Sequence, residues 1–419
     1  MAGTIGVAVP LSGKFKAWGD AILQGVALAI PEGGPVRVVA KDTRGEPDGA
    51  AEAVAQLAAE GAVAIVGGVT NAEALRAATA AQQAGVPLLS LSKVDGIADG
   101  RPYVFRLMLT ATAQAQALAE LAISRRGLRR VVVLYPEIPY GTELRTAFGA
   151  EVETRGGSIT RAVGYEGDRA NFAPMVKELV GRSQVEQRAD WREVQRAIAK
   201  EITDPYRRAK ALEKARKELP PIIEFDAVFV PDFARSVTLL APTLAVEDVV
   251  TATCEPSELK KIAKATGRKD LKAVQLIGGN GWGSDPSLFD VSPGGPGRHV
   301  RCAVFVDGFY AGSARPETRR FAEAYERKFG NSPTILEASA YDAARLVRAV
   351  VEQGKAATRE ALRDGLAGVK NFPGATGDLT VGPGRVVEKP LFYLTVDRDG
   401  LRELTKAELA APGAGGDAP

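Results

Sequence analysis

The chain has 419 residues, 45% of them hydrophobic and 25% charged, which is typical of a globular protein with two domains. Its 54 Lys and Arg against 51 Asp and Glu leave a net charge of +3, which gives no basis for binding nucleic acid or an anionic membrane. Two cysteines and a single histidine, His299, argue against a Cys/His metal centre and leave no obvious base for a Ser or Cys nucleophile. The composition therefore argues against a metalloenzyme, a hydrolase and a nucleic-acid binder, and we expect neither enzymatic activity nor a cofactor.

The first residues contain no secretory leader. A strand-like run, residues 4–9, follows almost at once on Met1, and no stretch reaches the 18 apolar residues of a membrane span. Two locations stay open: a cytoplasmic protein, or an exported one whose leader or upstream region is absent from this chain.

Short β-branched runs then alternate with Ala- and Leu-rich helical stretches in two successive series. The first predicts strands and helices, in chain order, at residues 36–41, 48–60, 63–66, 71–84 and 87–90. The second, beyond residue 110, predicts strands at residues 131–135, 159–164, 227–231 and 274–278, with helices at 141–154 and from 171. Such alternation predicts parallel sheets covered by helices on both faces, so the fold class is α/β with two Rossmann-like, doubly wound lobes.

Residues 182–218 interrupt the second series. They contain 11 Lys and Arg, 7 Asp and Glu and few large apolar residues, which predicts one or two exposed helices broken near Asp204-Pro205. Two interpretations stay open: a solvated surface insertion, and a helix pair that docks onto a partner.

The last part of the chain predicts helices at residues 317–329 and 337–352, a strand at 391–396 and a flexible tail at 406–419. Cys254 and Cys302 both fall in the second lobe. They could form one disulfide in an oxidising compartment, or remain free thiols.

Polar and aromatic side chains recur where the predicted strands end. Ligands of open α/β sheets bind at this edge, where loops and helix N-termini direct backbone amides into a crevice. The residues that we predict to bind ligand are Trp18, Asn71, Ser90, Ser92, Tyr140, Phe233, Asn280, Trp282 and Tyr310. Aromatic rings with hydroxyls, amides and few charges suit a small, partly apolar ligand.

Several segments, in order along the chain, resemble type I periplasmic solute-binding proteins of the Leu/Ile/Val-binding kind. They are IGVAVPLSG (5–13), IVGG (65–68), GVPLLS (85–90), YVFR (103–106), PYG (139–141) and AYD (340–342). Three others resemble a branch of this family labelled penicillin-binding-protein activator. They are FDAVFVPD (225–232), GGNGW (278–282) and AVFVDGFY (303–310).

The resemblance implies two lobes joined by a three-crossing hinge, which close on the ligand. Crossings are expected near residues 108–112, 305–310 and 372–378. The expected lobes are residues 1–111 with 308–372, and residues 112–307 with 373–405, the second lobe carrying the charged helical insertion.

The family's binding residues carry over only in part. In its amino-acid binders, hydroxyls and amides after the third and fourth strands hold the ligand carboxylate; the matching residues are Asn71 and Ser92, with Val94 where a threonine is expected. Trp18 and Tyr140 match the family's aromatic positions. Asn280 replaces the acid that pairs with the ligand ammonium, and an amide cannot supply that charge-assisted bond. A ligand without an ammonium group, or no small ligand at all, is therefore favoured.

The function that the resemblance implies is non-enzymatic binding of a small ligand in the periplasm or cell envelope. Its partners would be that ligand and the membrane subunits of an ABC transporter. The alternative is an envelope interaction protein that regulates a peptidoglycan synthase. The family also includes cytoplasmic effector-sensing regulators, and the missing leader leaves that option open.

Overall fold

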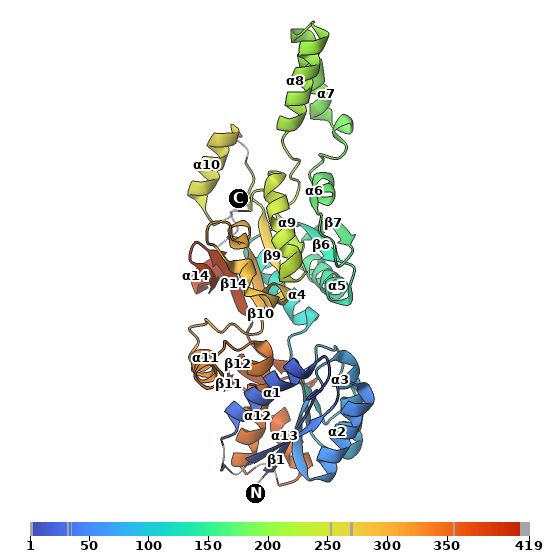
Figure 1. The fold of residues 1–419 in the computed structure, drawn as a ribbon, viewed down its shortest axis with the longest axis vertical. Helices are drawn as coiled ribbons and strands as arrows, with labels where there is room; N and C mark the ends of the chain where they lie inside the picture. Colours follow the sequence, from blue (N-terminus) through green and yellow to red (C-terminus); the bar gives the residue numbers. More distant parts are fainter. Residues whose placement is uncertain are drawn as a thin grey trace. The chain divides into compact units, whose positions relative to one another are not determined.

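The computed structural model describes residues 3–31, 33–34, 36–251, 254–268, 271–354 and 357–410. The chain folds into two compact units, Met1–Thr110 with Asp307–Phe392 and Ala111–Val306 with Tyr393–Pro419. Each unit contains a sheet of mainly parallel strands with helices packed on it (Figure 1), which confirms the α/β fold class. Among the described residues, none of the helices combines the length and the apolar character needed to cross a membrane.

Unit 1 is built on a five-stranded parallel sheet in the order β2-β1-β3-β4-β5. Its strands are β1 (Gly3–Val9), β2 (Val36–Asp42), β3 (Ala62–Gly67), β4 (Leu88–Ser90) and β5 (Val104–Arg106). Ile5, Val7 and Val9 of the interior strand β1 are completely buried, as expected for a strand covered on both faces.

Helices cover both faces of the unit 1 sheet. They are α1 (Lys16–Ala29), α2 (Pro47–Ala59), α3 (Asn71–Ala84), α11 (Pro316–Phe329), α12 (Ile335–Glu352) and α13 (Arg359–Ala367). Helices α1 and α12 pack against each other closely at Gly25, where a Cβ atom would lie 2.3 Å from the carbonyl oxygen of Glu337. A second core cluster joins the other face of the sheet to α2 and α3.

The last boundary of unit 1 differs from the prediction, which assigned residues 373–405 to the second lobe. Strands β11 (Phe372–Gly374), β12 (Gly377–Val381) and β13 (Val387–Glu388) form a small antiparallel sheet that belongs to unit 1. Leu379, Val381 and Val387 join the unit 1 core, and the chain leaves this unit only after Phe392.

Unit 2 is built on a seven-stranded sheet in the order β15-β14-β10-β9-β8-β6-β7. The strands are β6 (Arg130–Pro136), β7 (Ser158–Tyr165), β8 (Ala227–Val230), β9 (Gln275–Gly278), β10 (Val304–Asp307), β14 (Phe392–Asp397) and β15 (Gly400–Glu403). Strands β6 to β10 pair in parallel, whereas β15 returns antiparallel to β14 at the edge.

The helices of unit 2 are shorter and more varied than those of unit 1. The α-helices are α4 (Ala111–Ala119), α5 (Pro139–Thr154), α6 (Ala173–Leu179), α7 (Ala189–Glu201), α8 (Pro205–Glu218), α9 (Ala234–Val246), α10 (Pro256–Thr266) and α14 (Lys406–Ala410). A π-helical segment, η1 (Glu120–Arg125), continues α4. The 3-10 segments are η2 (Val185–Gln187), η3 (Asn280–Ser284), η4 (Pro286–Phe289) and η5 (Pro296–His299).

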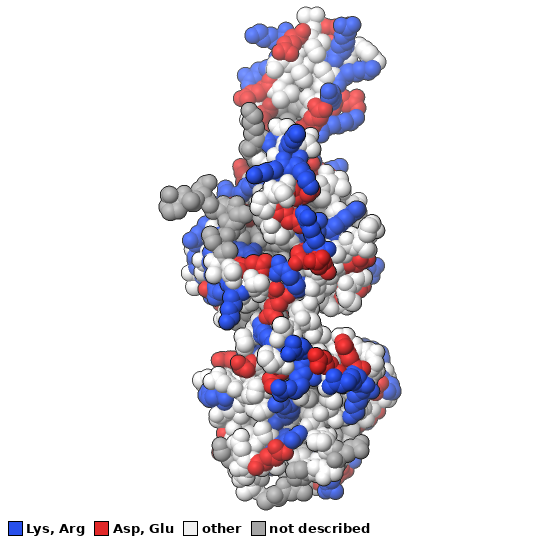
Figure 2. Space-filling model, turned by 90° about the vertical axis from the view of Figure 1, so that its left-hand side faces the viewer, with Lys and Arg blue, Asp and Glu red and all other residues white. Residues whose placement is uncertain are grey.

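The charged insertion forms a helical hairpin, α7 and α8, as predicted (Figure 1). Asp204 caps the second helix by accepting a hydrogen bond from the amide of Arg207 at 2.7 Å. Trp191 is buried in a small apolar cluster with Val185 and Leu219, so the hairpin has a core of its own. Figure 2 shows Lys and Arg side chains interspersed with Asp and Glu over the hairpin, at the top of the view.

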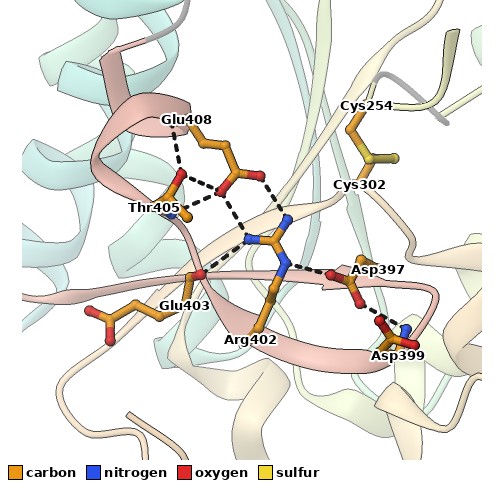
Figure 3. A network of polar contacts seen from close by, with 8 residues as sticks. All are labelled: Cys254, Cys302, Asp397, Asp399, Arg402, Glu403, Thr405 and Glu408. Carbon is orange, nitrogen blue, oxygen red and sulfur yellow. Dashed lines mark hydrogen bonds and ion pairs between the residues drawn. A yellow bond between two sulfur atoms is a disulfide. The ribbon is translucent and has the colours of Figure 1, made fainter. Parts of the chain in front are cut away.

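The predicted tail at residues 406–419 is partly wrong. Residues 406–410 form helix α14, which Thr405 and Glu408 cap reciprocally, and Glu408 also pairs with Arg402 at 2.7 Å (Figure 3). These bonds cap a segment, KAELA, whose residues all have high helix propensity. Residues 411–419 lie outside the described residues.

Candidate functional site

The nine predicted ligand-binding residues divide between the two units. Trp18, Asn71, Ser90, Ser92 and Tyr310 belong to unit 1, and Tyr140, Phe233, Asn280 and Trp282 belong to unit 2. In unit 2, three of the four come together in one constellation. In unit 1 they lie at the ends of different strands or in the loops and first helical turns that follow them.

Tyr140 and Asn280 form the centre of the unit 2 constellation. Tyr140 lies in the first turn of α5, and Asn280 begins η3, directly after β9. The Tyr140 hydroxyl donates to Oδ1 of Asn280 at 3.0 Å and accepts from the backbone amide of Gly281 at 2.7 Å. The amide of Asn280 in turn donates to Oε1 of Gln114 at 2.9 Å, so helix α4 also fixes the loop.

An aromatic pair lies beside this network. The Phe233 ring stacks on the Tyr140 ring with 4.7 Å between centroids and an interplanar angle of 28°. Phe233 keeps 39% of its surface exposed although it is a large apolar residue. An exposed ring stacked on a partly buried one is a surface suited to a flat, apolar group.

The neighbouring acid, Asp232, is buried and fully engaged. Its Oδ2 accepts from the Tyr165 hydroxyl at 2.7 Å, and its Oδ1 accepts from the amide of Phe233 at 2.7 Å. Burial, with a contribution from the Asp232 charge, raises the pKa of Tyr165 far above its usual range, so this hydroxyl remains a donor at all accessible pH values.

The Gly-Asn-Gly loop packs so closely against Tyr140 and Asp232 that both of its glycines are required. A Cβ atom at Gly281 would lie 2.6 Å from the carbonyl oxygen of Asp232 and 2.9 Å from the Tyr140 hydroxyl. At Gly279 it would lie 3.0 Å from the same hydroxyl. Only glycine therefore lets η3 approach α5 closely enough to form the network.

Trp282 is placed differently from the prediction. Its side chain is completely buried, its Nε1 donates to the carbonyl of Val230 at 3.0 Å, and its ring packs near Phe305. The 3-10 turn that begins at Asn280 directs this ring inward, beneath the loop. Trp282 thus supports the constellation and has no surface to offer a ligand.

In unit 1, Trp18 lies in the first turn of α1, directly after the loop that follows β1. The residue is 46% exposed, and its ring lies 5.0 Å from the Phe15 ring. Asp42, at the end of β2, ties this loop down by accepting from the Ser12 hydroxyl at 2.6 Å and from the amide of Leu11 at 2.8 Å. Desolvation opposes these hydrogen bonds, but together they lower the pKa of Asp42.

Asn71 is exposed at the first position of α3. Thr70 caps this helix in a reciprocal box with Glu73, which is itself buried and also accepts from the Thr43 hydroxyl. The Asn71 side chain is therefore not needed as a cap.

Ser90, the last residue of β4, and Ser92, two residues after it, are both completely buried. Ser90 Oγ accepts from the amide of Ser92 at 3.3 Å, and Ser92 Oγ accepts from the amide of Val94 at 3.1 Å. The two hydroxyls shape the loop that carries Lys93.

Lys93 belongs to a cluster of charges in unit 1. Desolvation lowers its pKa, which the charge of Asp307 opposes. Desolvation also raises the pKa of Asp307 to about 7, against the hydrogen bond from the amide of Gly308 and the charge of Lys93. Lys389, whose pKa desolvation lowers to about 8, donates to the Thr376 hydroxyl at 2.9 Å. Tyr310, half-buried, follows Asp307 by three residues.

Sequence reasoning missed Gln114 as part of the constellation. It is buried on helix α4, far from the other members in sequence, and no spacing rule connects it with Asn280. The structure joins Cys254 and Cys302 in a disulfide with 5.3 Å between Cα atoms, which ties the start of α10 to the sheet of unit 2 (Figure 3).

Comparison with known proteins adds to this geometry. The family model described as periplasmic binding protein matches residues 3–183 and 244–400. Leu/Ile/Val-binding protein homolog 3 of Brucella melitensis is 29% identical over 190 residues, which are 42% of this chain and 50% of that protein. The chain thus spans about half the length of this curated relative.

Two solved structures share the fold. One, from Rhodospirillum rubrum and assigned to a branched-chain amino acid ABC transporter, has a TM-score of 0.73 at 21% identity and covers 96% of this chain and 100% of its own. The other is a solute-binding protein of an ABC transporter from R. palustris in complex with benzoate. It has a TM-score of 0.61 at 16% identity and covers 99% of this chain and 97% of its own.

Proposed function

Because the chain belongs to the periplasmic binding protein family, we propose that it is a non-enzymatic, extracytoplasmic solute-binding protein. It binds a small polar or partly aromatic ligand and delivers it to the membrane subunits of an ABC transporter. The observation that carries this proposal is the constellation of Tyr140, Phe233 and Asn280 at the carboxyl ends of parallel strands in unit 2.

Unit 1 supplies a second set of residues to the proposal. Trp18 and Asn71 are exposed in the first turns of α1 and α3, the helices that follow β1 and β3, and Lys93 follows β4. These positions lie at the carboxyl ends of a parallel sheet, where open α/β folds bind ligands.

The relatives leave two ligand classes to consider. One relative is named for leucine, isoleucine and valine, and one structural neighbour holds benzoate. Both classes carry a carboxylate, and both fit a surface that combines aromatic rings with a few hydrogen-bonding groups.

A thermal-shift screen tests the proposal. The purified chain, unfolded and refolded to remove carried-over ligand, is heated with amino acids, amides, aromatic acids and sugars. A ligand at 100 times its Kd adds about 2.7 kcal/mol to the free energy of unfolding, enough for a rise of several degrees in Tm.

The double variant Trp18→Ala/Tyr140→Ala should lose the shift while keeping its fold by circular dichroism. Tyr206→Ala, a change at an exposed tyrosine of the hairpin, is the matched control and should show the same rise in Tm with ligand as the wild type. An unchanged affinity in the double variant would exclude these residues from the site.

A second candidate function, regulation of an envelope peptidoglycan synthase, rests on the hairpin α7–α8. The family match omits residues 184–243, which include this hairpin, and the hairpin has its own apolar core. It is thus an addition to the family fold rather than a part of the ligand-binding framework.

Purified peptidoglycan synthase from the same organism provides the test. Full-length chain should raise its rate, and a variant with residues 185–219 replaced by a short Gly/Ser linker should not, although it still binds small ligands. Equal stimulation by both forms would show that the hairpin is not the docking element.

A further inference from the structure

We propose that the ligand is an aromatic carboxylate without an ammonium group, and that Asn280 is the residue that sets this specificity. The inference rests on the proposed solute-binding function and deepens it by naming the ligand class. It follows from the direction of the hydrogen bonds around Tyr140, from the stacked rings of Tyr140 and Phe233, and from the contacts that the nearby acids already make.

The direction of the hydrogen bonds determines what Asn280 offers. The Tyr140 oxygen accepts from the backbone amide of Gly281, which can only donate, so its own proton requires an acceptor, and Oδ1 of Asn280 lies 3.0 Å away. The other end of the Asn280 side chain is the NH2 group, which has no hydrogen-bond partner among the described residues. Asn280 therefore presents a donor, which recognises an acceptor such as a carboxylate oxygen and cannot pair with an ammonium.

The acids of the constellation do not replace the missing partner for an ammonium. Both oxygens of Asp232 are engaged inside unit 2, by Tyr165 and by the amide of Phe233. Glu137, at the end of β6, is exposed, and its side chain lies against Gly164, where a Cβ atom would stand 2.6 Å from its Oε1. Among the residues that directly follow β6, β8 and β9, Glu137 is the one exposed acid. The test below therefore includes the variant Glu137→Gln.

The remaining contacts favour an aromatic anion. The exposed ring of Phe233, stacked on Tyr140, matches a flat apolar group in size and polarity. Together with the donor of Asn280, this ring favours a ligand that is both aromatic and an acceptor of hydrogen bonds.

Isothermal titration of the refolded full chain provides the test. Benzoate and 4-hydroxybenzoate are compared with L-leucine and L-phenylalanine, which carry the same carboxylate together with an ammonium. The wild-type chain should bind at least one of the aromatic acids about tenfold or more tightly than either amino acid.

Asn280→Asp is the decisive variant, because it keeps the shape of the side chain and the acceptor for Tyr140 but converts the unpartnered NH2 donor into an acceptor with a negative charge. It should weaken binding of the aromatic acid about tenfold or more and improve the relative affinity for L-phenylalanine. Asn331→Asp adds the same charge at an exposed position of unit 1. It should change neither the affinity for the aromatic acid nor that for L-phenylalanine.

Three results would overturn the inference. One is tighter binding of an amino acid by the wild-type chain, especially if Glu137→Gln removes that binding. Another is an unchanged ratio of affinities in Asn280→Asp. The third is binding of neither class by folded protein, which would also count against the proposed function, whereas the first two would leave it standing.

Discussion

The end of β9 shows how single atoms decide local stability in this chain. A Cβ atom at Gly278 would lie 2.3 Å from the buried ring of Trp282, whereas at Gly149, inside α5, the nearest atom would be 3.8 Å away. The same substitution should therefore have opposite effects at the two positions.

Gly278→Ala should lower the free energy of unfolding by about 1–3 kcal/mol through overpacking. Gly149→Ala should raise it by about 0.5–1 kcal/mol, because alanine loses less conformational freedom in a helix. Chemical denaturation of both variants checks the pair. Destabilisation of similar size in both would contradict the packing around Trp282.

The Arg402–Glu408 pair should make the C-terminal segment sensitive to acid. The hydrogen bond from Arg402, with those from Thr405, lowers the pKa of Glu408 to about 2 from an ordinary value near 4.5, against its desolvation. Because the folded-state pKa is the lower one, the pair stabilises the fold above about pH 4.5, and this contribution disappears as the pH falls toward 2.

Glu408→Gln should therefore lower Tm at pH 6 and make little difference near pH 2. Melting curves of the wild type and the variant across this range, at constant ionic strength, measure the effect. A Tm difference that stays constant with pH would assign the loss to packing rather than to the ion pair.

At the residue scale, the sequence predicted three residues of unit 2 that the structure brings together, but not the direction of every side chain. Tyr140, Phe233 and Asn280 were predicted from their position after strands, and the structure brings them together. Trp282 satisfied the same rule, yet the 3-10 turn directs it inward. Position along a strand is visible in the hydrophobic pattern, whereas side-chain direction depends on loop geometry.

The hairpin α7–α8 is an element with its own small core. Trp191 is buried there, whereas the adjacent Arg192 is exposed. Trp191→Ala removes about 3–5 kcal/mol of packing in comparable sites, more than so small a cluster should tolerate.

The variant should make residues 185–219 accessible to trypsin, which cleaves at the hairpin's Lys and Arg residues, while the Tm of the remaining protein stays within a degree or two. Arg192→Ala is the control and should not alter the rate of cleavage elsewhere in the hairpin. Global unfolding of Trp191→Ala would show that the hairpin core also supports unit 2.

Long elements were easier to predict than short ones. The strand expected at residues 131–135 is Arg130–Pro136, and the helix expected at 141–154 is Pro139–Thr154. Strands β11 to β13 were missed because they are short and lie in a Gly- and Pro-rich stretch that indicates turns. The π-helical segment Glu120–Arg125 has no sequence pattern that distinguishes it from an α-helix.

At the scale of the whole molecule, the two units should differ in their response to reductant. The Cys254–Cys302 disulfide closes a loop with a sequence separation of 48 residues inside unit 2, and loop entropy assigns such a crosslink about 4 kcal/mol. In the described residues of unit 1 there is no cysteine.

Reduction should therefore lower the unfolding transition of unit 2 by several degrees and leave that of unit 1 in place. Differential scanning calorimetry with and without a phosphine reductant measures this, with Cys254→Ser/Cys302→Ser as the control that no longer responds. A joint shift of both transitions would show that the units unfold cooperatively.

The packing of α12 against α1 also determines when the core of unit 1 can form during synthesis of the chain. Strand β1 and helix α1 emerge first, but Ala340, Ala343 and Val347, which cover Val26 and its neighbours, follow more than 300 residues later. Until then, one apolar face of the first sheet lacks its cover. We expect an incomplete chain to be prone to aggregation until α12 has emerged and can pack against α1.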